Sequence, residues 1–136
     1  MGKIVEFWKD REKNTIDPKL FSEKAEKLAR ILADDHKGSK GKKANKRTQL
    51  RKFYDEVLRL DSEARAGKTQ WERILPLVHM LTAKAAYAKG RDLVSNTFLT
   101  FIKDSVSQIQ EQKDLMVFAN FFEALMGFYR QHGPSN

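Results

Sequence analysis

The residues best suited to binding chemistry form one basic segment in the first half of the chain. No acidic residue occurs between His36 and Tyr54, and this window holds eight of the 26 lysines and arginines: Lys37, Lys40, Lys42, Lys43, Lys46, Arg47, Arg51 and Lys52. The other 18 basic residues are balanced by 18 Asp and Glu residues, so the whole formal net charge of +8 falls in this segment. A charge that serves only solubility is spread over the surface, so the concentrated excess indicates a polyanionic partner.

The chemistry of this segment suits the backbone of a nucleic acid. Lysine and arginine side chains bind it by displacing the counterions condensed on its phosphates. Arginine can also hold a phosphate through two parallel hydrogen bonds, and a glutamine amide can bond a sugar hydroxyl. The sequence therefore predicts RNA contacts in this segment for Lys42, Lys43, Lys46, Arg47, Gln49, Arg51 and Lys52. The competing interpretation is a solvated loop without a partner.

A second basic stretch lies between Glu72 and Asp92, where no acidic residue occurs. Its residues at the spacing i, i+3, i+4 and i+7 share one helix face: Lys84, Tyr87, Ala88 and Arg91. Alanines on this face let a strand approach, and the Tyr87 ring can stack on a base or a sugar. We add Lys84, Tyr87, Lys89 and Arg91 to the predicted RNA-binding residues. The alternative is that these cations only complement the dipole at the end of a helix.

Residue types that perform catalysis or bind metals are not grouped in this sequence. The absence of cysteine excludes a thiol nucleophile, a disulfide framework and a cysteine-based zinc site. The histidines lack metal-binding spacing: His36, His79 and His132. Gly67-Lys68-Thr69 resembles the end of a phosphate-binding P-loop, but Ser62 stands where the first glycine of that motif belongs. We expect no enzymatic activity, no cofactor and no metal.

Helices must position these residues, because apolar residues recur at helical spacing and no run alternates with a period of two. Capping residues, glycines and prolines predict five helices, from about Pro18 to His36, Thr48 to Ala66, Thr69 to Lys89, Asp92 or Ser95 to Ile109, and Asp114 to Gln131. Pro76 inside the third pattern predicts a kink or a later start of that helix.

The length of 136 residues suits one domain. The predicted fold is all-α, a single helical domain over residues 1–136 built as a bundle of about five helices with one long basic loop. Residues 1–15 are expected to form a polar N-terminal arm with the apolar anchors Ile4, Val5 and Phe7, plus Trp8, and docking on the bundle and a loose arm both stay open. Residues 36–47 are expected to form a mobile basic loop, because they contain no large apolar side chain whose burial would offset the entropy of ordering.

The last predicted helix is apolar nearly all round. Its large side chains are Phe118, Phe121, Phe122, Leu125, Phe128 and Tyr129. Burial in the core is the favoured interpretation, and pairing with another chain stays open. This most apolar stretch is too short for a membrane span, and the N-terminus has no apolar run of signal-peptide length. We expect a cytoplasmic protein without membrane contact.

Two segments resemble the small subunit of type III-A CRISPR effector complexes, the Csm type. The first is Thr48–Tyr54 (TQLRKFY), which follows a lysine-rich loop. The second runs from Leu75-Pro76-Leu77-Val78 through Lys84-Ala85-Ala86-Tyr87-Ala88 to Gly90-Arg91. The pattern Phe98, Phe101, Ile102 and the overall length also fit, and the resemblance covers residues 17–130.

The resemblance implies a five-helix, non-catalytic RNA-binding subunit of an antiviral ribonucleoprotein, stacked in several copies as a filament along the guide RNA–target RNA duplex. Guide RNA, target RNA, other effector subunits and copies of the chain itself are the implied partners. By position, Gln49, Arg51 and Lys52 match the RNA-facing helix, and Lys84 and Arg91 match the second basic helix. A subunit that serves any guide must grip the backbone without reading bases.

Other interpretations stay open at this point. The chain could be a helical protein–protein scaffold whose basic loop has no direct RNA role, and the isolated protein could be a homodimer that pairs through its last helix. A helical DNA-binding regulator is less favoured, because its basic recognition face would have to follow a short turn instead of a long loop. The role of the N-terminal arm also stays open.

Overall fold

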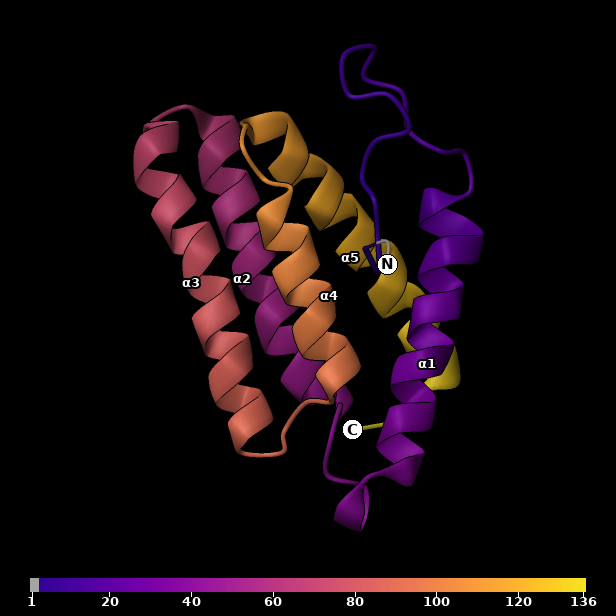
Figure 1. The fold of residues 1–136 in the computed structure, drawn as a ribbon. Helices are drawn as coiled ribbons and strands as arrows, with labels where there is room; N and C mark the ends of the chain where they lie inside the picture. Colours follow the sequence, from indigo (N-terminus) through magenta and orange to yellow (C-terminus); the bar gives the residue numbers. More distant parts are fainter. Residues whose placement is uncertain (1–2) are drawn as a thin grey trace.

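Five α-helices form a bundle in the computed structural model, which describes residues 3–136 (Figure 1). They are α1 (Ala25–Gly38), α2 (Arg47–Ala66), α3 (Trp71–Gly90), α4 (Asn96–Ser107) and α5 (Gln112–His132). No strand forms within residues 3–136, where the only β pairing is an isolated bridge between Asp10 and Thr15. The predicted all-α bundle of five helices is confirmed.

Helix α5 lies at the centre of the packing, because both α1 and α2 pack against it, while α3 packs against α4 and α2. The ring centroid of Phe101 on α4 lies 5.4–5.8 Å from those of Phe118, Phe121 and Phe122 on α5. Leu125 and Tyr129 are also buried, and Phe128 packs against the same core. The core interpretation of the last helix is therefore confirmed.

Several helix ends differ from the prediction. Helix α1 continues to Gly38, and a π-helical turn, Leu20–Lys24, precedes it. Helix α3 begins at Trp71 and runs through Pro76, so the predicted later start is wrong. Pro76 lies in the second turn, where its missing N–H removes only one intrahelical hydrogen bond. At α4, the predicted start at Ser95 is confirmed, since its hydroxyl accepts a hydrogen bond from the Phe98 amide.

The basic loop between α1 and α2 is shorter than predicted, and its C-terminal end is fastened to the bundle. It spans residues 39–46 instead of 36–47 and contains a 3-10 turn, Lys40–Lys42. The fully buried Asn45 is the fastening residue. Its side-chain amide donates to the Leu32 carbonyl and the Ser95 hydroxyl, and its Oδ1 accepts from the Ser95 amide at 2.8 Å. The Tyr129 hydroxyl donates to the Asn45 carbonyl. Polar contacts thus order a segment that has no large apolar side chain.

The described part of the N-terminal arm, residues 3–15, is docked on the bundle at α4 and α5. Phe7 is fully buried, and its ring stacks on Phe118 with the centroids 5.9 Å apart. Its amide donates to the side chain of Gln108, whose own amide donates to the Val5 carbonyl. The arm is polar in composition, but it contributes apolar side chains to the core.

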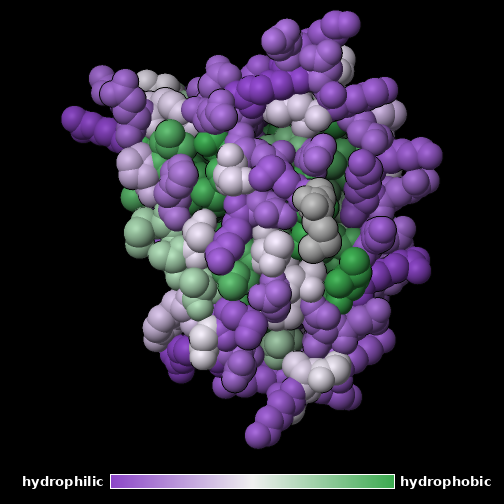
Figure 2. All heavy atoms as spheres, in the orientation of Figure 1, coloured by the Kyte–Doolittle hydropathy of each residue, from purple (hydrophilic) through white to green (hydrophobic). Residues whose placement is uncertain are grey.

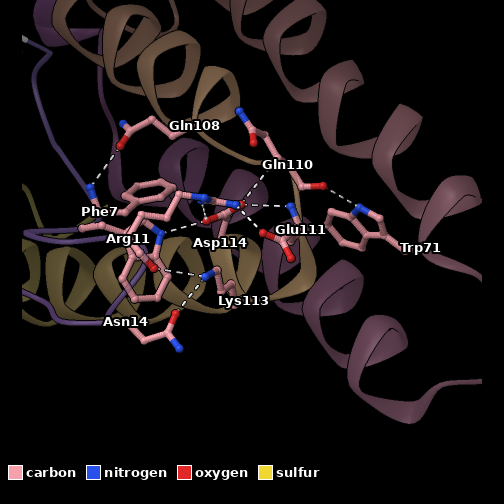
Figure 3. Close-up of polar contacts among 10 residues, drawn as sticks. Phe7, Arg11, Asn14, Trp71, Gln108, Gln110, Glu111, Lys113 and Asp114 are labelled. Atoms are coloured by element: carbon pink, nitrogen blue, oxygen red, sulfur yellow. Dashed lines mark hydrogen bonds and ion pairs between the residues drawn. The ribbon is translucent and has the colours of Figure 1, made fainter.

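One buried carboxylate, Asp114 at the start of α5, ties the arm to the bundle (Figure 3). The Trp8 indole donates to its Oδ1 at 2.8 Å, and the Arg11 guanidinium donates to both of its oxygens. The amides of Gln110 and Glu111 donate to its Oδ2, each at 2.9 Å. Asp114 therefore caps α5 and holds the arm at the same time.

No helix within residues 3–136 is long and apolar enough to cross a membrane.

Candidate nucleic-acid interface

The two basic segments predicted from the sequence meet in one open groove between α2 and α3. Five predicted RNA-binding residues line it: Gln49 and Lys52 from α2, Lys84 and Tyr87 from α3, and Arg91, the residue that follows α3. Its volume is about 410 Å³, and its apolar lining comes from Phe53, Leu81, Ala88 and Leu93. Polar and cationic side chains thus flank an apolar surface, as in sites that hold a nucleic-acid strand.

Matching spacing on the two helices produces this groove. Residues 49, 52, 53 and 56 of α2 follow the pattern i, i+3, i+4 and i+7, and so do residues 84, 87 and 88 of α3 together with its C-cap residue, Arg91. Such residues lie on one face of a helix. Phe53 and Ala88 turn inward and are buried, whereas Lys52 and Arg91 are exposed. Helices α2 and α3 pack side by side (Figure 1). The two stripes therefore line the same groove.

Tyr87 is the most exposed of the aromatic and aliphatic side chains that line the groove, with 66% of its surface accessible. The Arg91 guanidinium carbon lies 5.8 Å from the centre of its ring, and Arg91 Nη1 donates to the Tyr87 hydroxyl at 3.3 Å. The ring therefore holds the guanidinium at the groove on one side, while much of the Tyr87 side chain stays accessible to a stacking partner.

One carboxylate, Glu56, faces these cations. Its Oε2 lies 3.6 Å from Lys84 Nζ, and Arg59 donates to both of its oxygens at 2.9 and 3.0 Å. The hydrogen bonds from Arg59 lower the pKa of Glu56, and the positive charges of Arg59 and Lys84 add to the shift. Glu56 is therefore ionised at neutral pH.

Two further predicted residues, Lys43 and Lys89, line a second open hollow of about 840 Å³. Lys40 joins them there, together with the carboxylates of Asp34, Asp35 and Asp92. This hollow holds as many carboxylates as lysines, which distinguishes it from the α2–α3 groove, where Glu56 alone faces three cations. RNA contact by Lys43 and Lys89 stays a prediction.

The structure does not bring the remaining predicted residues into the groove. Lys42 and Lys46 are exposed on the loop. The Arg47 guanidinium donates to the Ser135 carbonyl at 2.6 Å, and Arg51 Nε lies 4.0 Å from Asp55. RNA contact by these four residues also stays a prediction.

Sequence reasoning missed the apolar surface of the groove and its one carboxylate. Phe53, Leu81 and Leu93 were not among the predicted site residues, although they form part of the groove surface. Glu56 was not considered, although its spacing of seven residues from Gln49 places it on the same helix face. Within residues 3–136, no group of three His, Asp or Glu side chains is placed to hold a metal ion.

Comparison with known proteins identifies the family. The model of the family described as Csm2 Type III-A matches residues 16–135, which include all five helices and every residue of the groove. No curated protein and no solved structure matches the chain. The family match agrees with the resemblance seen in residues 48–54 and 75–91. The chain belongs to the Csm2 Type III-A family, the small structural subunit of a type III-A CRISPR effector complex.

Proposed function

We propose that this small subunit grips the backbone of guide or target RNA in the α2–α3 groove without reading bases, and that it leaves catalysis to other subunits. Membership of the type III-A complex puts RNA and other subunits within its reach. The observation that carries the proposal is the convergence of two sequence-distant basic segments on one groove. Charges that serve only solubility need not lie together, whereas Lys52, Lys84 and Arg91 line one groove.

The chemistry of the groove supports contact with the backbone. Lys52, Lys84 and Arg91 can neutralise phosphates, Gln49 can bond a ribose hydroxyl, and Tyr87 can stack on any base. None of these contacts requires a particular base. This neutrality suits a protein that must accept every guide sequence.

Replacing Lys52 and Arg91 together with alanine should lower the affinity for unrelated single-stranded RNAs about tenfold, because two charge-assisted phosphate contacts are lost. The slope of log affinity against log salt should fall by about 1.4. Fluorescence anisotropy at several salt concentrations, on the isolated protein and on the assembled complex, measures both effects.

Lys68 and Arg73 provide the matched control for this variant. Both are exposed cations near the junction of α2 and α3, neither lines the groove, and neither is a predicted RNA contact. Alanine at these two positions should change RNA affinity less than the Lys52/Arg91 variant does. Equal losses would favour diffuse attraction over a groove, and a loss for one RNA sequence only would contradict backbone binding.

A second candidate function, association between copies as a filament or a homodimer, is favoured by the outer edge of α3. Leu77 and Met80 are 40% and 50% exposed there, and Figure 2 shows apolar surface along this edge. If copies associate through α3, Met80→Glu should abolish that association without lowering the melting temperature. Sedimentation velocity checks the mass, and Lys103→Glu on the exposed surface of α4 is the control. Unchanged association of the Met80 variant would exclude this edge.

A further inference from the structure

The α2–α3 groove contains a negative charge, although its proposed ligand, RNA, is itself negatively charged. Among the groove-lining residues, all within residues 3–136, Lys52, Lys84 and Arg91 are cationic and Glu56 alone is anionic. A carboxylate at a phosphate-binding surface repels the ligand and competes for its cations. Glu56 nevertheless lies beside Lys84, with its Oε2 3.6 Å from Lys84 Nζ.

Glu56 is held firmly at this position by groups on its own helix. The Arg59 guanidinium forms two hydrogen bonds with the Glu56 carboxylate, and Arg59 is itself held by Glu63 at 2.8 Å. These residues lie three and four positions apart, so the ion pairs form along one face of α2. Glu56 therefore cannot swing away from the groove without losing Arg59.

Lys84 is the loosely held member of this network. Its Nζ lies 3.6 Å from the Glu56 carboxylate, farther than either nitrogen of Arg59, and its side chain is 52% exposed. It is also attached to the neighbouring helix α3, and its four-carbon stem can change rotamer freely. Lys84 can leave Glu56 while the pair between Glu56 and Arg59 stays intact.

From this asymmetry we infer that Glu56 is a built-in competitor of RNA phosphate for Lys84, which sets the affinity of the groove below what its cations alone would give. The inference rests on the proposed function. When RNA binds, Lys84 exchanges the carboxylate for a phosphate, and Glu56 stays paired with Arg59. If the affinity of each single subunit for RNA is low, stable binding requires several subunits to contact the same RNA at once.

The test is the Glu56→Gln variant, which keeps a hydrogen-bond acceptor for Arg59 and removes the competing charge. Its affinity for unrelated single-stranded RNAs at low salt should be about two- to fivefold higher than that of the wild type, the range expected for a partly exposed ion pair. Glu63→Gln is the matched control, because Glu63 also pairs with Arg59 but does not line the groove. This control should leave the affinity unchanged.

A double-mutant cycle with Lys84→Ala separates competition from general repulsion. In the Lys84→Ala background, Glu56→Gln should no longer raise the affinity. A gain of the same size in that background would overturn the inference, because the carboxylate would then act on RNA directly or through Arg59. Glu56→Ala, checked for folding by circular dichroism, should give the same result and guards against an effect specific to glutamine.

The outcomes also separate this inference from the proposed function. If the Lys52/Arg91 variant loses affinity but Glu56→Gln and Glu56→Ala gain none, the groove binds RNA and the inference is wrong. If the Lys52/Arg91 variant loses no affinity, the proposed function itself fails, whatever the Glu56 variants do.

Discussion

Replacing Asp114 with asparagine should lower the free energy of unfolding by about 3–4 kcal/mol, because a buried carboxylate loses its charge while its donors stay in place. The Trp8 indole, the Arg11 guanidinium and the amides of Gln110 and Glu111 all donate to this carboxylate. An asparagine amide can accept from some of these groups but turns two further donors toward the others. Urea unfolding followed by circular dichroism measures the loss.

The same carboxylate predicts how stability depends on pH. Burial by itself raises the pKa of Asp114, but the hydrogen bonds from Arg11, from the Gln110 and Glu111 amides and from Trp8 outweigh it and lower the pKa. A group with a lowered folded pKa stabilises the fold fully above its unfolded pKa of about 3.9 and loses that contribution as the pH falls through the folded value. Asp114→Asn should therefore lose less stability on acidification below about pH 4 than the wild type does.

Glu111→Gln is the control for the Asp114 variant. Glu111 also pairs with Arg11, at 2.7 Å, but 62% of its side chain is exposed. Solvent screens such a pair, so its loss should change the free energy of unfolding by less than about 1 kcal/mol. Equal losses in the two variants would contradict the special role of the buried carboxylate.

Asn45→Ala should be the second strongly destabilising change, at about 3 kcal/mol, because three buried hydrogen bonds to Leu32 and Ser95 are lost. Part of the loss is conformational. Asn45 has a φ of 60°, a region that asparagine tolerates better than alanine does. Thermal unfolding of the variant measures the total effect.

Two controls separate these contributions. Asp92 has a φ of 59° and is exposed, so Asp92→Ala measures the cost of the backbone conformation with little change in buried contacts. Asn45→Gly removes the side chain without that backbone cost, so it should lie between Asn45→Ala and the wild type. If Asn45→Gly is as stable as the wild type, the buried hydrogen bonds contribute nothing.

The helices could be predicted because apolar residues recur at helical spacing along most of the chain, and capping residues add to this signal at α4 and α5. Ser95 shows this, since its hydroxyl caps α4 as its position suggests. The loop and the arm could not be predicted in the same way. From the sequence, Asn45 is typical of a loop. Only its hydrogen bonds with Leu32, Ser95 and Tyr129 in the folded protein make it an anchor. Predicting order from the apolar side chains of one segment overlooks polar contacts between segments that are distant in the sequence.

The candidate site was partly predictable for a related reason. Helical spacing places Lys84, Tyr87 and Arg91 on one face of their helix, and charge counting singles out the segment around Lys52. That these two surfaces share a groove depends on how α2 and α3 pack, and no periodicity within one segment contains that information. The position of Glu56 against Lys84 is a cross-helix contact of the same kind.

The docked arm has a consequence for where this protein can be divided. The family match begins at residue 16, so it leaves out the arm. The packed core nevertheless extends into the arm, because Val5 and Phe7 are buried in it and Arg11 neutralises the buried Asp114. A protein trimmed to the matched residues would uncover the face of Phe118 and leave a buried charge unpaired. In this chain, the residues that the family match covers and the residues that build the core are therefore not the same set.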